Sequence, residues 1–355
     1  MVMQHVDDRT VQDQAAGARE AARLWAPPQR AVTPQSLLPG NLTPSTLEAG
    51  SRVGLELIGA LDQVLAGTHG VAEIAVACLL SRGHLLIDDI PGVGKTLLAQ
   101  VLAAAVGGTC HRIQGTPDLL PGDVTGSMVP DRESMTLRFR PGPVFANIVV
   151  FDELNRTSPR TQAALLEAAE EATVSVDGVT HRLPDPFMLV ATQNPLEILG
   201  THRLGEGALD RFAAVVTPGR PGFDDEVEVL AGRRGRTLLA GVVPVAPMQA
   251  ITLARTIVDQ IHMAEPIARY VVEVLDATRT HPRVRLGAST RAGVALIGLA
   301  RSMAMLRGRA YVVPDDIATV AVPALAHRVL VIDGSLAAGR DVVGECLARV
   351  RPPSA

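Results

Sequence analysis

The chain has 355 residues, of which 47% are hydrophobic and 3% aromatic, and it carries a net charge of −4. This length suits two modest domains plus a tail, with cores built mainly from aliphatic side chains. The acidic balance and the lack of a basic block argue against nucleic acid as a partner. No apolar stretch approaches the ~20 residues that cross a bilayer, so we expect no direct membrane insertion.

Cysteine usage indicates the compartment. Cys78, Cys110 and Cys346 lie far apart and lack the spacing of metal ligands. Buried free thiols are the simpler interpretation, and they are typical of a reducing environment. Residues 1–30 lack the apolar segment of a signal peptide. We therefore expect a cytoplasmic protein.

The first elements follow a tail. Residues 1–45 mix charged residues with several prolines and predict a disordered N-terminal segment. A helix is expected from Ser45 to Leu65, opening on a capping-box pattern, and another over Val71–Leu80. From there to about Thr217, short apolar runs alternate with helical stretches, which predicts an α/β layer with a parallel sheet.

The only lysine of the chain, Lys95, follows a glycine-rich turn at the end of the apolar strand His84–Asp88. Strand, turn and helix N-terminus converge backbone N–H groups on an anion. Lys95 would reach the β- and γ-phosphates of a nucleotide, and the Thr96 hydroxyl would bind Mg²⁺. The predicted nucleotide-binding residues are Asp89, Ile90, Pro91, Gly92, Val93, Gly94, Lys95 and Thr96. Asp89 replaces the usual first glycine, which could weaken binding or alter the path of the loop.

A second buried strand, Ile148–Phe151, ends in Asp152 and Glu153. Ligands of α/β proteins bind at the carboxyl edge of the sheet, so both carboxylates are expected beside the phosphates. Asp152 would hold Mg²⁺, and Glu153 would orient and deprotonate the attacking water. Asp-Glu after a strand is also common as a solvated strand end. Its position downstream of Lys95 in the same alternating domain favours the catalytic interpretation.

Two further polar residues complete the candidate site. The strand Phe187–Thr192 leads to Asn194, whose amide could hold the attacking water, although Gln-Asn-Pro alone is only a turn signal. Arg211 lies in a Leu-Asp-Arg-Phe run at a helix end, where a surface ion pair is the plain alternative. The segment Pro218–Phe223 reads as a hinge. Beyond it only helices are predicted, over Asp224–Arg234, Gln249–Met263, Ile267–Thr278, Thr290–Leu306, Pro314–Leu325 and Asp341–Val350.

With these segments in order, the chain resembles the MoxR family of AAA+ ATPases, in the helix-2-insert branch. The resemblance spans about residues 84–317 and rests on HLLIDDIPGVGKTLLA, RIQGTPDLLPGDVTGS, FRPGPVFANIVVFDELNR, TQAALLEAAEEATVSVDG, LPDPFMLVATQNP, LDRF and GASTRAGVALIGLARSMAMLRGRAYVVPDDI. A departure occurs at Gly205–Ala208, where GEGALDRF replaces the more usual PEAQLDRF. This puts in doubt the local geometry before Arg211.

The resemblance implies a fold and a role for each motif. The fold is a P-loop AAA+ parallel five-stranded sheet of order 5-1-4-3-2, flanked by helices and followed by a smaller all-helical lid domain. The implied division is a tail over 1–45, an ATPase core over 46–218 and a lid over 219–355. The implied roles are Walker A for Asp89–Thr96, Walker B for Asp152 and Glu153, sensor 1 for Asn194, arginine finger for Arg211 and sensor 2 for Arg291.

Partners are also implied by the resemblance. A homo-hexameric ring is expected, and a β-rich insert is expected in Gly115–Phe145. Independently of the resemblance, Thr173–Leu183 predicts a β-hairpin that turns at Asp177-Gly178. Clients would be proteins, with von Willebrand A domain proteins as plausible partners. Our hypothesis is an ATP hydrolase that uses Mg²⁺ and remodels clients like a chaperone. The alternatives are a non-hydrolysing nucleotide-dependent ring scaffold and a chelatase-like motor subunit.

Overall fold

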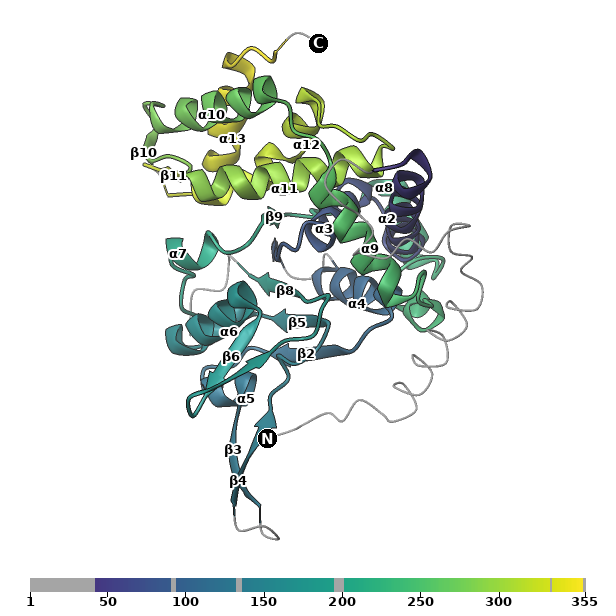
Figure 1. The fold of residues 1–355 in the computed structure, drawn as a ribbon, viewed down its shortest axis with the longest axis vertical. Coiled ribbons are helices and arrows are strands. Elements are labelled where there is room, and N and C mark those ends of the chain that lie inside the picture. The colour runs from purple at the N-terminus through teal and green to yellow at the C-terminus, as the bar shows by residue number, and fades with distance from the viewer. Residues whose placement is uncertain (1–41, 91–93, 132–135, 195–200, 333, 354–355) are drawn as a thin grey trace.

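The structure is a computed structural model that describes residues 42–90, 94–131, 136–194, 201–332 and 334–353 (Figure 1). The predicted tail lies almost wholly outside the described residues, as do Pro91, Gly92 and Val93 of the glycine-rich turn. Up to the hinge, the elements are α2 (Pro44–Val64), α3 (His69–Leu80), β1 (Leu85–Asp88), α4 (Lys95–Val106), β2 (Cys110–Gln114), α5 (Pro121–Thr125), β3 (Gly126–Asp131), β4 (Thr136–Pro141), β5 (Ile148–Asp152), η2 (Leu154–Arg156), α6 (Pro159–Glu171), β6 (Thr173–Val176), β7 (Val179–Arg182), β8 (Met188–Gln193), α7 (Glu206–Leu209) and β9 (Ala214–Val216).

A five-stranded parallel sheet of order β2-β5-β8-β1-β9 forms the centre of the first part. Counted along the chain without the hairpins, this is the predicted order 5-1-4-3-2, which is therefore confirmed. Strands β1 and β5 are buried along their whole length because helices cover both faces of the sheet. Alternate residues of β1 face opposite sides. Leu85 and Ile87 join the core that α2, α3 and α4 share with the lid, and Leu86 joins the core beneath α6.

Two hairpins project from this layer. β3 and β4 pair antiparallel and form the long arm at the bottom of Figure 1, whereas β6 and β7 form the shorter one. Asp177 and Gly178 connect β6 to β7 with positive φ angles of 51° and 76°, as the predicted two-residue turn requires. Phe139 of β4 stacks on His181 of β7 with ring centroids 4.0 Å apart, so the two hairpins support each other.

The part after the predicted hinge is mainly helical. Its elements are α8 (Phe223–Leu230), η3 (Arg236–Gly241), α9 (Met248–Gln260), α10 (Glu265–Arg279), β10 (Val284–Leu286), α11 (Thr290–Leu306), α12 (Pro314–Leu325), η4 (Ala326–Arg328), β11 (Leu330–Val331) and α13 (Leu336–Arg349). The predicted bounds of α11 and α12 are reproduced to the residue. The short antiparallel pair β10–β11 interrupts the helices-only pattern that the sequence predicts. A two-residue strand such as β11 is too short to produce a visible period-2 signal.

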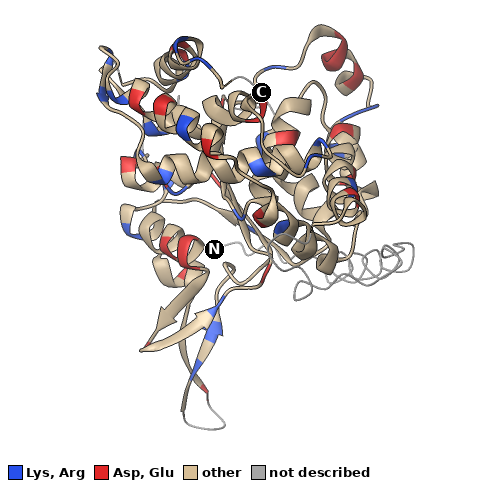
Figure 2. Ribbon diagram, turned by 45° about the horizontal axis from the view of Figure 1, so that its top comes forward, with Lys and Arg blue, Asp and Glu red and all other residues tan. Residues whose placement is uncertain are grey.

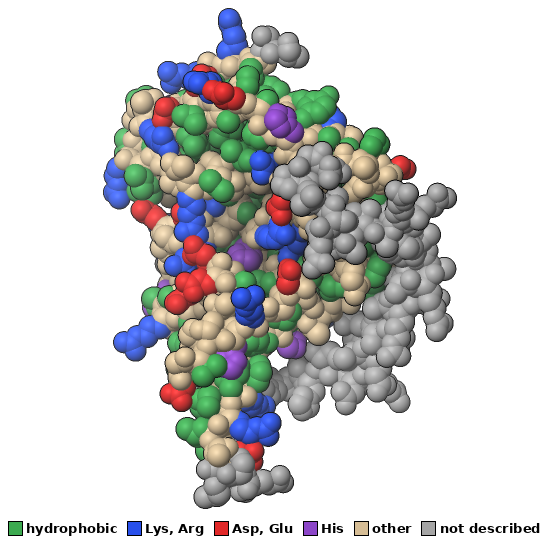
Figure 3. Space-filling model, viewed as in Figure 1, with side chains coloured by type: hydrophobic (Ala, Val, Ile, Leu, Met, Phe, Trp, Pro, Cys, Tyr) green, Lys and Arg blue, Asp and Glu red, His purple; other side chains and the backbone are tan. Residues whose placement is uncertain are grey.

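The helices after β9 pack against α2 and α3 as well as against the sheet. Ser51 of α2 donates to the carbonyl of Leu306 on α11, and the fully buried Arg255 of α9 donates to the carbonyls of Leu79 and Phe187. A buried guanidinium is tolerated here because several acceptors satisfy it. Among the described residues, no helix combines the length and apolar character needed to cross a lipid bilayer. Lys/Arg and Asp/Glu positions are interspersed along the ribbon (Figure 2), and the face in Figure 3 carries side chains of both charges.

A buried histidine makes the fold sensitive to acid. His84 donates from Nε2 to the carbonyl of Ala169, 3.0 Å away, and its Nδ1 accepts from the N–H of Leu189. The bond accepted by Nδ1 requires the neutral ring, and burial lowers the pKa of His84 to about 4. The unfolded chain therefore binds more protons between pH 4 and 6.5, so this contribution to stability is complete above the unfolded pKa and is lost as pH falls.

We expect the free energy of unfolding to decline by about 3 kcal/mol between pH 7 and pH 4 from this ring alone. Urea unfolding at a series of pH values measures it. His84→Gln should be less stable at pH 7 and should show a shallower pH dependence. Equal pH slopes for the two proteins would contradict the assignment.

Candidate active site

The carboxyl ends of β1, β5 and β8 meet at one edge of the sheet, as their parallel register requires. A cavity of about 210 Å³ opens there and is lined by Lys95, Thr96, Arg112, Gln114, Asp152, Glu153, Thr192 and Asn194. Five of these eight are site residues predicted from the sequence. The structure therefore brings together residues that lie up to 99 positions apart, from Lys95 to Asn194.

Helix α4 begins at the cavity. Its N-cap, Gly94, has φ 83°, and no atom lies within 4 Å of where a Cβ would be, so the backbone conformation alone demands glycine. The Lys95 ammonium donates to the carbonyls of Asp89 and Gln193, at 2.6 and 2.7 Å. Burial lowers the pKa of Lys95, and four nearby carboxylates oppose that shift. A bound polyphosphate would add negative charge and favour the ammonium further.

The Asp152 carboxylate faces the hydroxyl of Thr96. Thr96 donates to Oδ1 at 3.0 Å, and Thr192 donates to the same oxygen at 3.3 Å. The other oxygen, Oδ2, accepts from Nε of Arg112 at 2.7 Å. A hydroxyl and a carboxylate side by side form the hard oxygen donor set that suits Mg²⁺. The described part of the chain contains no group of three or more His, Cys, Asp or Glu side chains that could hold a metal ion.

Glu153 adopts a left-handed backbone conformation, φ 55°. Such strain in a non-glycine residue is concentrated at functional sites. Its N–H donates to the Thr192 hydroxyl, and its Oε2 accepts from Gln114 at 2.8 Å and from Arg156 at 3.1 Å. These contacts hold the carboxylate at the cavity wall, next to Asp152.

Asp89, the departure in the glycine-rich turn, does not aim its carboxylate at the cavity. Oδ1 accepts from the N–H of Ile90 at 2.7 Å, and Oδ2 accepts from the N–H of Gly219 in the hinge. The side chain is only 6% exposed. The Asp89 side chain therefore binds the segment predicted as a hinge and does not face the cavity. Its backbone carbonyl accepts a hydrogen bond from the ammonium of Lys95.

The two predicted arginines lie at the other edge of the sheet. Arg211 precedes β9, whose first residue, Ala214, is paired with the first residue of β1. Both Arg211 and Arg291 bind the carboxylate of Glu170, with N–O distances of 3.1 and 2.7 Å. The length of β1 separates this cluster from Lys95, about 10 Å of strand alone. The structure thus places Arg211 and Arg291 together and apart from the other site residues.

Sequence reasoning missed part of the cavity. Gln114 directly precedes the insert that the sequence predicts over Gly115–Phe145; it ends β2 and is paired in register with Asp152. Arg112, two positions earlier on the same strand, went unnoticed. Assigning Cys110–Gln114 to the strand beside β5 places both residues near the sheet edge that carries Asp152. The signal is weak because this edge strand is mostly exposed and carries three polar residues.

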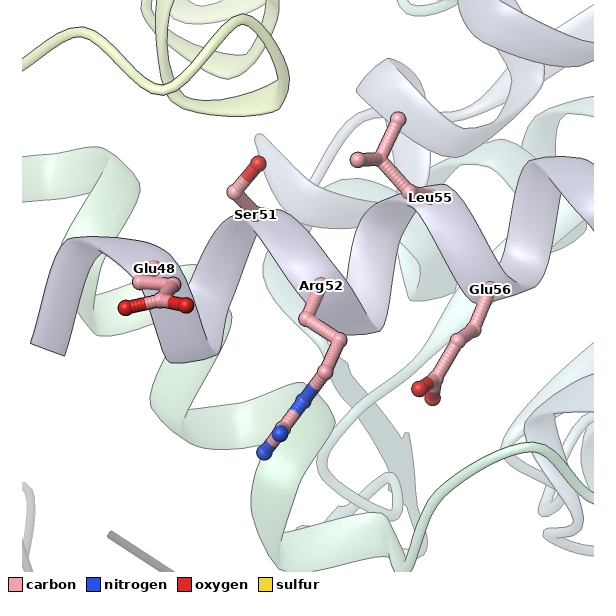
Figure 4. Close-up of a pocket in the computed structure, with 5 residues that line it drawn as sticks. All are labelled: Glu48, Ser51, Arg52, Leu55 and Glu56. Atoms are coloured by element: carbon pink, nitrogen blue, oxygen red, sulfur yellow. The ribbon is translucent and has the colours of Figure 1, made fainter. Parts of the chain in front are cut away.

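A second hollow, of about 440 Å³, runs along the outer side of α2 and is lined by Glu48, Ser51, Arg52, Leu55 and Glu56 (Figure 4). Arg52 and Glu56 point to one side of the helix, and Ser51 and Leu55 point to the other. It contains no strand end and no glycine-rich turn, and it shares no residue with the cavity at Lys95. We assign no site to it.

Comparison with known proteins gives two family matches. Residues 84–214 match the model described as the ATPase family associated with various cellular activities (AAA), and residues 276–343 match the AAA lid domain. A crystal structure of a candidate ATPase from Cytophaga hutchinsonii has a TM-score of 0.77 and 30% sequence identity, covering 87% of this chain and 97% of that one. Together with the sheet order, these matches support an AAA+ fold.

Several relatives are similar over most of their length. YeaC, an uncharacterized protein of Bacillus subtilis, is 41% identical over 82% of this chain and 92% of its own. Chaperone MoxR1 of Mycobacterium tuberculosis is 36% identical, covering 78% and 75%, and Protein MoxR of Paracoccus denitrificans is 30% identical, covering 76% and 86%. The chain belongs to the MoxR family of AAA+ ATPases.

Proposed function

We propose that this protein hydrolyses ATP with Mg²⁺ and uses the reaction to remodel or mature client proteins. The observation that carries the proposal is the cavity in which Lys95, Thr96, Asp152 and Glu153 meet at one sheet edge. Phosphoryl transfer is catalysed mainly by positioning and charge compensation, and this set supplies both.

Each residue has a task in this proposal. Lys95 and the N-terminus of α4 bind the β- and γ-phosphates, because both present positive charge to the cavity. Thr96 and Asp152 would hold Mg²⁺, which when bound neutralises charge on the phosphate oxygens. Glu153 accepts a proton from water, and Asn194 orients that water. Gln114 and Arg156 would have to give way for Glu153 to turn toward it.

The position of Arg211 and Arg291 supports assembly. An arginine that stands at the opposite edge of the sheet from Lys95 cannot reach the phosphates of its own subunit. In a head-to-tail ring the same arginines face the next subunit's cavity. We therefore propose that Arg211 and Arg291 complete a neighbour's site in a homo-hexameric ring.

The wider biology is part of the same proposal. A chaperone-named relative favours protein clients, and von Willebrand A domain proteins are the partners we would test first. The free cysteines of the described residues, Cys78, Cys110 and Cys346, agree with a cytoplasmic location, where ATP is available. The boundaries 46–218 for the core and 219–355 for the lid remain predictions.

Lys95→Ala tests nucleotide binding directly. We expect calorimetry to show ATP affinity lowered by more than tenfold, because a charged hydrogen-bond donor is removed from the phosphate site. Lys95→Arg should fail to restore it, since a planar guanidinium does not fit between the carbonyls of Asp89 and Gln193. Circular dichroism controls for folding. Wild-type affinity in folded Lys95→Ala would refute the phosphate site.

A further inference from the structure

The beginning of the interdomain hinge is fastened to the phosphate loop. The Thr217 hydroxyl donates to the carbonyl of Asp88 at 2.7 Å, and the N–H of Gly219 donates to the carboxylate of Asp89. The second oxygen of that carboxylate accepts from Ile90, the next residue of the loop. Asp89, which replaces the usual first glycine of the motif, thus connects the phosphate loop to the hinge.

The last lid helix joins the same connection. Arg340 of α13 donates through Nη2 to the hydroxyl of Thr217. Thr217 is two positions before Gly219. The start of the hinge is therefore bound to the lid through Arg340 and to the phosphate loop through Asp88 and Asp89. Arg291 makes no such link, because it lies with Glu170 at the far edge of the sheet.

The charges explain why an arginine is placed here. Asp88 and Asp89 are both buried, with 7% and 6% exposure. Burial raises the pKa of Asp88, while a hydrogen bond from Gln193 and the charges of Arg340 and Lys95 oppose that shift. If Arg340 moves away from Thr217, Lys95 is the positive charge that remains close to both Asp88 and Asp89. Its ammonium is then drawn toward them and away from a bound phosphate.

We infer that Arg340 and Asp89 are positioning residues that couple the lid to the phosphate loop of the same subunit, through Thr217 and Gly219. This inference rests on the proposed ATPase function. The packing of α13 against the hinge determines how far the Lys95 ammonium is available to bind the nucleotide phosphates. Conversely, nucleotide in the cavity alters the stability of α13.

Hydrogen exchange with ADP and Mg²⁺ as the probe tests the coupling. In the wild type, ADP should slow exchange of amides over 95–106 and, by about threefold or more, over 336–349. Arg340→Met should keep the first effect and lose the second, and Arg340→Lys should restore it. Arg349→Met is the matched control, because Arg349 is exposed at the other end of the same helix.

Steady-state kinetics separate positioning from a purely structural role. Arg340→Met and Asp89→Asn should each lower kcat by roughly five- to tenfold with KM changed less than about twofold. Because both act through one segment, the double variant should be no slower than the slower single variant. If the fold losses in kcat of the two single variants multiply in the double variant, the inference is overturned.

The outcomes distinguish this inference from the proposed function. If ADP protects 95–106 but leaves 336–349 unchanged in the wild type, or protects both equally in Arg340→Met, the coupling is refuted and the ATPase proposal stands. If ADP protects neither segment in the folded wild type, the nucleotide site itself is wrong.

Discussion

Glu153→Gln should lower ATP turnover by about 10²–10⁴-fold while ATP stays bound. The substituted amide would keep the shape of the side chain and could still accept the hydrogen bond from Gln114, but it cannot take a proton from water. The phosphate contacts of Lys95 and Thr96 are untouched, so affinity should change little. A coupled phosphate-release assay and calorimetry with ATP measure the two quantities separately.

Glu167→Gln provides the matched control. It makes the same substitution on α6 at an exposed position outside the cavity, and it should leave turnover unchanged. A non-hydrolysing scaffold would instead show near-zero turnover in both the wild type and Glu153→Gln. Comparable, substantial turnover in the wild type and Glu153→Gln would remove Glu153 from the chemistry.

The same variant identifies the client. An ATP-trapped ring releases substrate slowly, so affinity capture with Glu153→Gln followed by mass spectrometry should enrich proteins that Lys95→Ala does not. Enrichment of von Willebrand A domain proteins would support the partner we propose. Enrichment of the subunits of a metal-chelation complex would instead support the chelatase-like alternative.

Arg211→Ala should reduce turnover by about 10³–10⁵-fold without weakening ATP binding. The reason is geometric: Arg211 lies at the opposite end of the strands from its own Lys95, so in the proposed ring it would stabilise a neighbour's phosphate. Arg236→Ala removes an exposed arginine elsewhere and should have no effect. Turnover per subunit should also fall on dilution as the ring dissociates.

Mixing two inactive proteins tests the trans arrangement. Arg211→Ala subunits retain Glu153, and Glu153→Gln subunits retain Arg211, so one kind of interface in a mixed ring is complete. An equal mixture should recover up to about one quarter of the wild-type rate. The mixture is measured at concentrations where rings form, and subunit exchange is verified with the wild type. If the mixture stays inactive under these conditions, Arg211 does not act across the interface.

Local patterns predicted much of what the structure contains. Helix α11 begins at Thr290 because Ser289 caps it, and α4 ends at Val106 because the C-cap residue Gly107 adopts φ 72°. The strand that carries Asp152 is recognisable because a parallel strand covered on both faces is continuously apolar. Such signals lie within a few consecutive residues, so the chain carries them without reference to its fold.

Other relations depend on segments distant in sequence. The pairing of Arg211 and Arg291 on Glu170, the approach of Gln114 to Glu153 and the link from Arg340 to Thr217 join residues 39 to 123 positions apart. Charged and polar side chains carry no periodic signal that names their partner, because their contacts are decided by which strand ends and helix ends meet. The candidate residues for the chemistry could therefore be proposed from the sequence, whereas their separation into a group in the cavity and a group at the opposite end of the strands follows only from the parallel sheet.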